Sequence, residues 1–174
     1  MPPVTRGFVG RRPRDRRLPP GQYDAGDQWP VLTAERAPTL DTARWTFRID
    51  GLVERPVEWT WDEIRALPRE RWDGDIHCVT TWSKFGMRWS GVAVDTLLET
   101  AGPLPEARFA VAHSHSGYTT NMPLSDLTGG RAWLAFEAQG APLTREHGGP
   151  ARLLVPHLYF WKSAKWVAGL RLTA

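Results

Sequence analysis

Short segments in which apolar and polar residues alternate recur along the chain, and turn residues end most of them. Trp45, Phe47 and Ile49 alternate with polar residues before Asp50-Gly51, which predicts a β-strand that ends at a turn. Segment 57–61 is its expected partner. Further strands are expected at residues 76–79, 109–112, 118–124, 133–137, 152–155 and 166–172. Because short strands are mixed with few helices, we predict an α+β fold with mixed β-sheets.

Two short helices are expected among these strands. Thr60 followed by Glu63 forms a capping-box pattern, so a helix should begin after Thr60 and stop at Pro68. Residues 94–101 form a second helical segment, and Gly102 is its expected C-cap.

The N-terminal segment differs in composition from the rest. Residues 1–40 contain seven prolines, which disfavour regular structure. Residues 1–20 carry six arginines against one acidic residue, a charge of +5, while the whole chain carries +3, so the remainder carries −2. We therefore expect a flexible basic arm over residues 1–18 and one domain over residues 19–174. A solvated arm is the simplest interpretation, and contact with nucleic acid or anionic lipid is the alternative.

Composition limits the class of protein further. A chain of 174 residues fits a single domain. Its ten tryptophans exceed what the core needs and are typical of walls around a large flat ligand, although core packing is the commoner explanation. The single cysteine excludes an internal disulfide and favours a cytoplasmic protein. No segment has the pattern of a membrane span or of an export signal.

That single cysteine, Cys78, is the first candidate for chemistry. It lies between apolar residues of an expected β segment that leads into a loop rich in Trp, Ser and Gly, where an inert buried thiol is common. A thiolate is also the soft ligand that redox-active transition metals prefer. With no spaced Cys or His partner it cannot build a zinc or iron–sulfur site. If Cys78 binds a metal, the other ligands must come from a cofactor.

Lysine is rare in this chain and is clustered. Of 22 basic residues only Lys84, Lys162 and Lys165 are lysines, and two of them flank Ser163-Ala164. Two ammonium groups, a hydroxyl and backbone N–H groups suit a phosphate, although exposed lysines are usually only solvated. The loop from His147 through two glycines to Arg152 could line a ligand or be a plain turn with a surface arginine.

Three motifs occur in a fixed order: Cys78…Trp82-Ser83…Trp89…Gly91, then Gly149-Pro150-x-Arg152-Leu153…Val155-Pro156, then Lys162-Ser163-Ala164-Lys165-Trp166. This order and spacing resemble the molybdopterin domain of the sulfite oxidase family, from about Pro19 to the end of the chain. The resemblance is strongest to the small, heme-free branch that includes the catalytic subunit of the bacterial protein-methionine-sulfoxide reductase. It implies a sulfite oxidase-type fold, and it favours the ligand role of Cys78 over the inert thiol.

The resemblance also implies roles for individual residues. Cys78 matches the ligand of a molybdenum–molybdopterin cofactor, which is expected in its mononucleotide form. Residues implied to contact the cofactor are Leu32, Thr33, Ser83, Ser114, His147, Arg152, Lys162, Ser163, Ala164 and Lys165. His77 precedes the cysteine where sulfite oxidases carry arginine, so a cationic pocket for sulfite is not expected. Together with Arg88, His77 is expected to orient the substrate.

The expected function is two-electron oxygen-atom transfer on a small sulfur- or nitrogen-oxo substrate. The chain is expected to contain no heme and to exchange electrons with a separate donor or acceptor protein. Two other classes are weighed against it. One is a cofactor-free module that binds anions or nucleic acid through the basic arm. The other is a thiol enzyme with His77 as base to Cys78, which is disfavoured because neighbours on a strand point to opposite faces.

Overall fold

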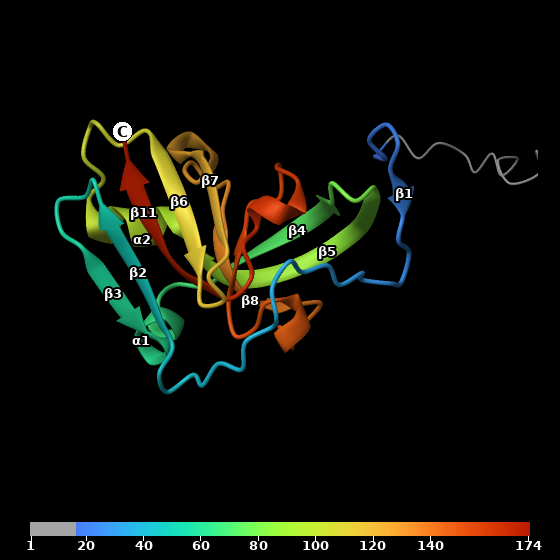
Figure 1. Cartoon of the computed structure of the whole chain (residues 1–174), viewed down its shortest axis with the longest axis horizontal. Coiled ribbons are helices and arrows are strands. Elements are labelled where there is room, and N and C mark those ends of the chain that lie inside the picture. The colour runs from blue at the N-terminus through green and yellow to red at the C-terminus, as the bar shows by residue number, and fades with distance from the viewer. Residues whose placement is uncertain (1–16) are drawn as a thin grey trace, which may run out of the picture.

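The computed structural model describes residues 17–174, which form two β-sheets and two short helices (Figure 1). The six-stranded sheet has the order β1-β5-β8-β10, with β4 paired to β5 and β9 paired to β8. Its strands are β1 (Tyr23–Asp24), β4 (Glu70–His77), β5 (Trp82–Ala93), β8 (Trp133–Ala138), β9 (Ala141–Pro142) and β10 (Arg152–Leu154).

The second sheet has five strands in the order β3-β2-β11-β6-β7. They are β2 (Thr46–Gly51), β3 (Val57–Thr60), β6 (Phe109–Ser114), β7 (Thr119–Pro123) and β11 (Val167–Thr173). Strand β11 pairs parallel to β2 and antiparallel to β6, so this sheet is mixed. The predicted α+β fold is confirmed.

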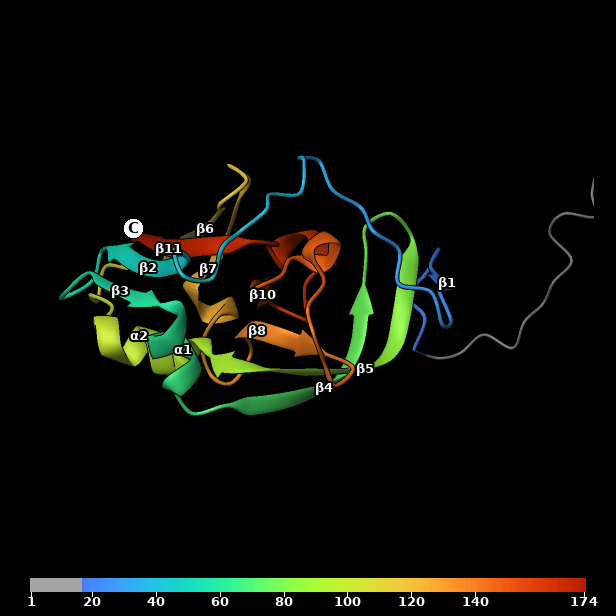
Figure 2. The same cartoon turned by 90° about the horizontal axis from the view of Figure 1, so that it is seen from below.

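The helices α1 (Trp61–Ala66) and α2 (Val94–Ala101) lie on one face of the five-stranded sheet (Figure 2). The predicted capping box is present, because the Thr60 side chain accepts from the Glu63 N–H while the Glu63 carboxylate accepts from the Thr60 N–H. Gly102 ends α2 in the left-handed conformation, as predicted. Neither helix, of six and eight residues within the described chain, is long enough to cross a membrane.

The largest differences from the sequence-based expectation lie in the β4–β5 hairpin. β4 ends at His77, so Cys78 belongs to the following turn and not to a strand. β5 occupies twelve residues where a loop was expected. Its first three and last three residues are all buried, which hides the alternation that identifies a strand. β1 lies in the proline-rich N-terminal segment of residues 1–40, called the leader below, which was expected to lack regular structure. It pairs parallel to the start of β5.

Smaller differences concern element ends. Trp61 begins α1 and is not part of β3, and Leu124 begins a 3-10 turn and is not part of β7. Val155 and Trp166 lie just outside β10 and β11. Such shifts of one residue follow from caps and turns that periodicity does not reveal.

Buried side chains form two clusters. The larger cluster packs the helices against the five-stranded sheet and includes Phe47 and Ile49. The smaller one contains Cys78, Trp82, Trp89 and Phe160, so the cysteine lies in a second apolar region at the six-stranded sheet. Residues 1–16, most of the expected basic arm, lie outside the described chain, and the boundary between arm and domain stays a prediction.

Candidate functional site

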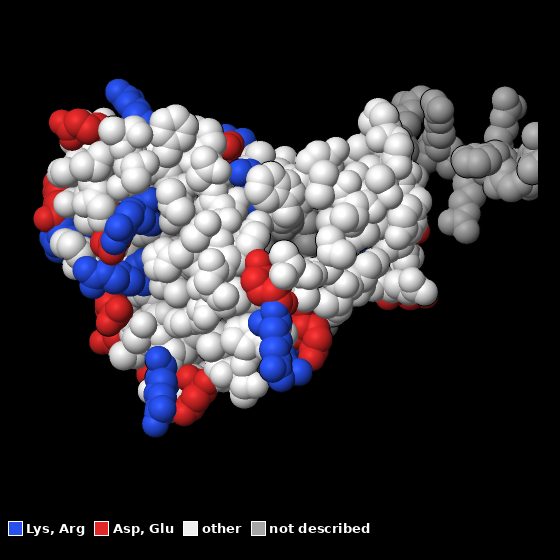
Figure 3. Space-filling model, in the orientation of Figure 1, with Lys and Arg blue, Asp and Glu red and all other residues white. Residues whose placement is uncertain are grey.

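A cavity of about 170 Å³ opens beside the smaller cluster. The segment that leads from β1 to β2 crosses this region (Figure 1). The space-filling view shows a hollow in the same face, with acidic and basic side chains at its lower edge and further charged side chains over the five-stranded sheet (Figure 3). The cavity is lined by residues 29–35, Cys78, Val79, Trp82, Tyr118, Glu146, His147, Arg152, Phe160, Trp161 and residues 163–166. Four segments distant in sequence therefore meet at one site.

Cys78 lies at the start of the turn that joins β4 to β5. Its N–H donates to the Trp82 carbonyl at 2.8 Å, and its own carbonyl accepts from the Thr81 N–H at 3.0 Å. The side chain is 6% exposed and lines the cavity. Its Sγ lies 3.1 Å from the Thr80 hydroxyl oxygen. The hairpin thus presents a buried sulfur at the wall of a cavity.

Arg152 enters the same cavity from β10 and is 2% exposed. Its guanidinium donates to the carbonyls of His147 at 2.8 Å and Ser163 at 2.6 Å, and it lies 4.0 Å from the centre of the Phe160 ring. No carboxylate in residues 17–174 forms an ion pair with it. Burial lowers the pKa of Arg152 to about 9, and the nearby Cys78 acts in the opposite direction. A buried cation paired only with carbonyls favours an anion in the cavity.

Lys165 adds a second positive charge. Its ammonium donates to the carbonyls of Leu32 at 2.9 Å and Glu146 at 3.0 Å. Burial, and then the charge of Arg152, lower the pKa of Lys165 to about 8. Gly148 lets the neighbouring loop approach these cations, because a Cβ there would lie 2.9 Å from the Lys165 Cβ and 3.1 Å from the Arg152 Cβ.

Ser163 and Ala164 line the cavity between these two cations. The Ser163 hydroxyl accepts from the Val155 N–H at 2.9 Å, which fixes the loop onto the chain after β10. Both residues are buried. The Ser-Ala-Lys segment therefore forms one wall of the site, as the sequence motif predicts for a ligand-binding loop.

His147 forms another wall together with Trp29, which the sequence analysis did not identify. The two rings stack with centres 3.7 Å apart. His147 donates from Nε2 to the Trp29 carbonyl at 3.3 Å and accepts at Nδ1 from Thr144 at 3.0 Å. Burial lowers the pKa of His147, so the ring is neutral at pH 7. The Trp29 Nε1 is buried and forms no hydrogen bond within the described residues.

The leader contributes Leu32 and Thr33 to the same side of the cavity. Leu32 is 60% exposed and uses its carbonyl to hold Lys165. The Thr33 hydroxyl donates to the Glu35 carbonyl at 2.8 Å. Tyr118 was also not identified from sequence; its hydroxyl donates to the Trp161 carbonyl at 2.8 Å.

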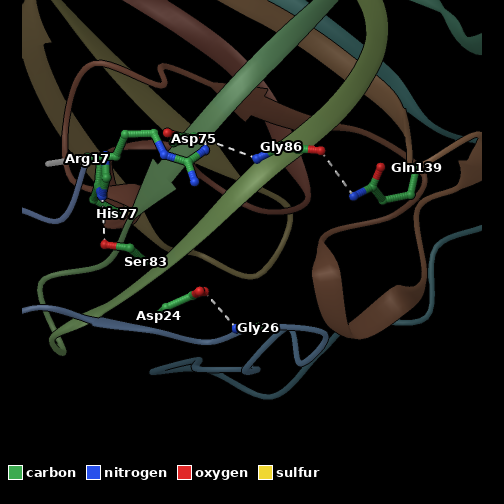
Figure 4. Close-up of polar contacts among 8 residues, drawn as sticks. All are labelled: Arg17, Asp24, Gly26, Asp75, His77, Ser83, Gly86 and Gln139. Carbon is green, nitrogen blue, oxygen red and sulfur yellow. Dashed lines mark hydrogen bonds and ion pairs between the residues drawn. The ribbon is translucent and has the colours of Figure 1, made fainter. Parts of the chain in front are cut away.

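His77 and Ser83 do not line the cavity. They are paired across the hairpin, with His77 Nδ1 2.7 Å from Ser83 Oγ (Figure 4). The Ser83 hydroxyl donates to Gln22 Oε1 at 3.0 Å, and Gln22 Nε2 donates to the Cys78 carbonyl at 2.9 Å. Burial lowers the pKa of His77. His77 is thus linked to the turn at Cys78 through Ser83 and Gln22, and no hydrogen bond joins it to the Cys78 sulfur in residues 17–174.

Three other expected residues also lie outside the cavity lining. Arg88 is exposed on β5, on the face opposite the buried Trp89, and its Nε donates to Gln139 at 3.2 Å. Lys162 donates to the Asn121 carbonyl. Ser114 is buried at the end of β6, and its hydroxyl has no hydrogen-bond partner in the described residues.

The donor set for a metal is limited. Residues 17–174 contain no cluster of three or more His, Cys, Asp or Glu side chains that could hold a metal ion. A metal at Cys78 would therefore need its other ligands from outside the described residues. The cavity offers one soft sulfur, two cations and aromatic walls.

Comparison with known proteins identifies this arrangement. Residues 34–174 match the oxidoreductase molybdopterin binding domain. An uncharacterized oxidoreductase of Bacillus subtilis, YuiH, is 41% identical over 158 residues, which cover 90% of this chain and 79% of that protein. The protein-methionine-sulfoxide reductase catalytic subunit MsrP of Gluconobacter oxydans is 29% identical over 157 residues, which cover 80% of this chain.

A solved structure gives the same assignment. The crystal structure of the sulfane dehydrogenase SoxCD from Paracoccus pantotrophus aligns with a TM-score of 0.72 and 26% identity, over 84% of this chain and 44% of that chain. The chain spans 50% of the length of the MsrP relative. With the predicted sulfite oxidase-type fold confirmed and the domain match covering residues 34–174, the chain belongs to the family of molybdopterin-binding oxidoreductases of the sulfite oxidase type.

Proposed function

We propose that this chain binds molybdenum–molybdopterin in the cavity, with Cys78 as the protein ligand of the metal. We further propose that it catalyses oxygen-atom transfer on a small sulfur- or nitrogen-oxo substrate. The observation that carries the proposal is the presence, in one cavity, of a buried sulfur and a buried guanidinium that has no carboxylate partner among the described residues.

The residues present fit such a cofactor. A thiolate suits a soft, redox-active metal, and a dithiolene would supply the ligands that the described residues do not. The side-chain hydrogen bonds of Arg152 and Lys165 go only to carbonyls, and although Glu35 and Glu146 offset part of the Lys165 charge, the buried Arg152 keeps its charge available to an anionic phosphate. The buried Trp29 Nε1 is a donor with no partner at the cavity wall.

Each part of the chain then has a separate task. When bound, the cofactor supplies two-electron redox chemistry in which an oxygen atom moves to or from the substrate. Cys78 holds the metal at the cavity wall, and Arg152, Ser163 and Lys165 bind the anionic tail. Aromatic side chains of the cavity exclude water and shape the space for substrate. They are Trp29, Trp82, Phe160 and Trp161.

His77 and Arg88 receive no substrate-binding role in this proposal, because neither lines the cavity. In this proposal the substrate is therefore oriented by other residues, at the exposed edge of the cavity. Val31, Leu32, Val79 and Trp161 are the large apolar residues there that are most exposed.

Three finer points belong to the same proposal. A phosphate-bearing tail on the cofactor, which the mononucleotide form carries, is supported by the two cations that line the cavity. A separate electron-transfer protein is supported by the relatives named as catalytic subunits, because such a name implies a further subunit. A cytoplasmic location is supported by the single cysteine, which cannot form an internal disulfide.

The test is the variant Cys78→Ser, compared with wild-type protein expressed in a host that makes the cofactor. We expect molybdenum and pterin in the wild-type protein, and turnover with at least one of dimethyl sulfoxide, trimethylamine N-oxide or sulfite. We expect a folded Cys78→Ser protein without turnover, because a hard hydroxyl replaces the soft thiolate poorly. Wild-type turnover in the variant would refute ligation by Cys78. Strongly salt-dependent binding of nucleic acid by metal-free wild-type protein would favour the binding module instead.

A further inference from the structure

We propose that Thr80 is a positioning residue for Cys78, because its hydroxyl oxygen lies 3.1 Å from the Cys78 sulfur in a turn whose shape is fixed from several sides. The inference rests on the proposed ligation of a metal by Cys78. Thr80 does not reach the substrate; it acts through the sulfur.

The turn itself fixes where Thr80 lies. Residues 79–81 form a three-residue loop that joins Cys78 to Trp82. The Cys78 N–H donates to the Trp82 carbonyl across the base of the loop, and the Thr81 N–H donates to the Cys78 carbonyl within it. Such loops place their last residue in the left-handed region, where glycine is usual. Here that residue is Thr81, with φ of 73°. A β-branched residue in this region is strained, and strain of this kind persists only where the surroundings hold the backbone in place.

The leader keeps the backbone of this turn in place. Gln22 Nε2 donates to the Cys78 carbonyl at 2.9 Å, and the Tyr23 N–H donates to the Thr81 carbonyl at 2.8 Å. The Ser83 hydroxyl in turn fixes the Gln22 carboxamide at 3.0 Å. Both ends of the turn are therefore bound to the leader, so the Thr80 hydroxyl is kept beside the sulfur.

The direction of the Thr80 hydrogen bond follows from the state of the sulfur. A sulfur that ligates a metal is a thiolate and carries no proton, so only the Thr80 hydroxyl can donate. Such a hydrogen bond withdraws electron density from the sulfur and weakens its donation to the metal. Weaker donation favours the reduced metal, so Thr80 raises the reduction potential of the site.

The test compares Thr80→Val, which keeps the shape and removes the hydroxyl, with Thr80→Ser, which keeps the hydroxyl. Thr119→Val, an exposed threonine of β7, is the matched control. In the metal-free proteins, the rate of alkylation of the only cysteine by iodoacetamide at one fixed pH reports the contact. We expect an alkylation rate about threefold different from wild type in Thr80→Val, because the sulfur loses its hydrogen-bond partner. Thr80→Ser and Thr119→Val should match wild type.

In the molybdenum-loaded proteins, the readouts are the midpoint potential of the metal and its sulfur-to-metal absorption band. We expect a lower potential and a shifted band in Thr80→Val, and wild-type values in Thr80→Ser and Thr119→Val. Molybdenum-loaded Thr80→Val with the wild-type potential and band would overturn the role of Thr80 while leaving the proposed function intact. Wild-type protein that takes up no molybdenum would overturn both, even where alkylation detects the contact.

Discussion

Replacing Arg152 by methionine separates a binding role from a structural one. Methionine is shorter, unbranched and uncharged, so it fills the space of the apolar arginine stem while removing the guanidinium that lies against Phe160. If Arg152 serves mainly to hold the protein together, the cofactor-free protein should lose stability. If Arg152 serves mainly to bind an anion, the loss should appear only in cofactor binding.

The structure gives the size of each effect. The pKa of Arg152 is lowered from its ordinary value to about 9, chiefly by burial, which corresponds to roughly 5 kcal/mol for keeping the group charged at pH 7. This cost destabilises the folded state below pH 9 and is relieved as the pH rises above it. The two carbonyl hydrogen bonds return about 1.5–3 kcal/mol each, and the Phe160 contact about 0.5–2 kcal/mol. The opposing effects nearly cancel in the cofactor-free protein.

We therefore expect Arg152→Met to change the free energy of unfolding of the cofactor-free protein by less than about 2 kcal/mol, measured by urea denaturation at pH 7. Molybdenum content after identical purification should fall at least about tenfold, because a charge-assisted hydrogen bond is lost. Arg171→Met is the control, since Arg171 is exposed and paired with Asp50 at 2.9 Å. Wild-type molybdenum content in Arg152→Met, or a stability loss above about 4 kcal/mol, would refute this reasoning.

Two further predictions follow from the same region. Cofactor loading should weaken as the pH rises from 7 to 9, because the pKa of Lys165 is lowered to about 8 and the ammonium is charged only below that pH. Lys165→Arg should flatten this pH dependence of loading. An equally steep profile in that variant would exclude Lys165 as the source of the dependence. Thr81→Gly should raise the free energy of unfolding of the cofactor-free protein by about 0.5–1 kcal/mol, because glycine adopts a positive φ without strain. An unchanged melting temperature in this variant would show that the turn is not strained.

The five-stranded sheet and its helices could be predicted because one side of each element faces the core. Phe47 and Ile49 alternate with exposed or half-buried residues, and the α1 cap is encoded locally by Thr60 and Glu63. The β4–β5 hairpin could not, because β5 is buried on both faces at its two ends. The short strand β1 exists only through its pairing with β5, which no local pattern encodes.

The candidate site shows the same division. Cys78 and Lys165 could be identified because cysteine and lysine are rare in this chain, and Arg152 could be identified from its place in the ordered motifs. The register of β5 could not be predicted, so Arg88 was expected at the cavity although it lies on the opposite face from Trp89. Trp29 gave no periodic signal in the leader, and only its stacking on His147 reveals its place.

The leader contacts the candidate site at three points. Its carbonyl at Leu32 holds Lys165, its Trp29 covers His147, and its Gln22 holds the cysteine turn. Trp29 packs on the smaller apolar cluster and stacks on His147, and the other two contacts are hydrogen bonds, so the stability of this segment depends on its contacts with the site. Lys165 has three donors and two already have carbonyl partners, so the third can donate to a bound anion while the same ammonium still holds the Leu32 carbonyl. Occupancy of the cavity and the position of the leader over it are therefore coupled through Lys165.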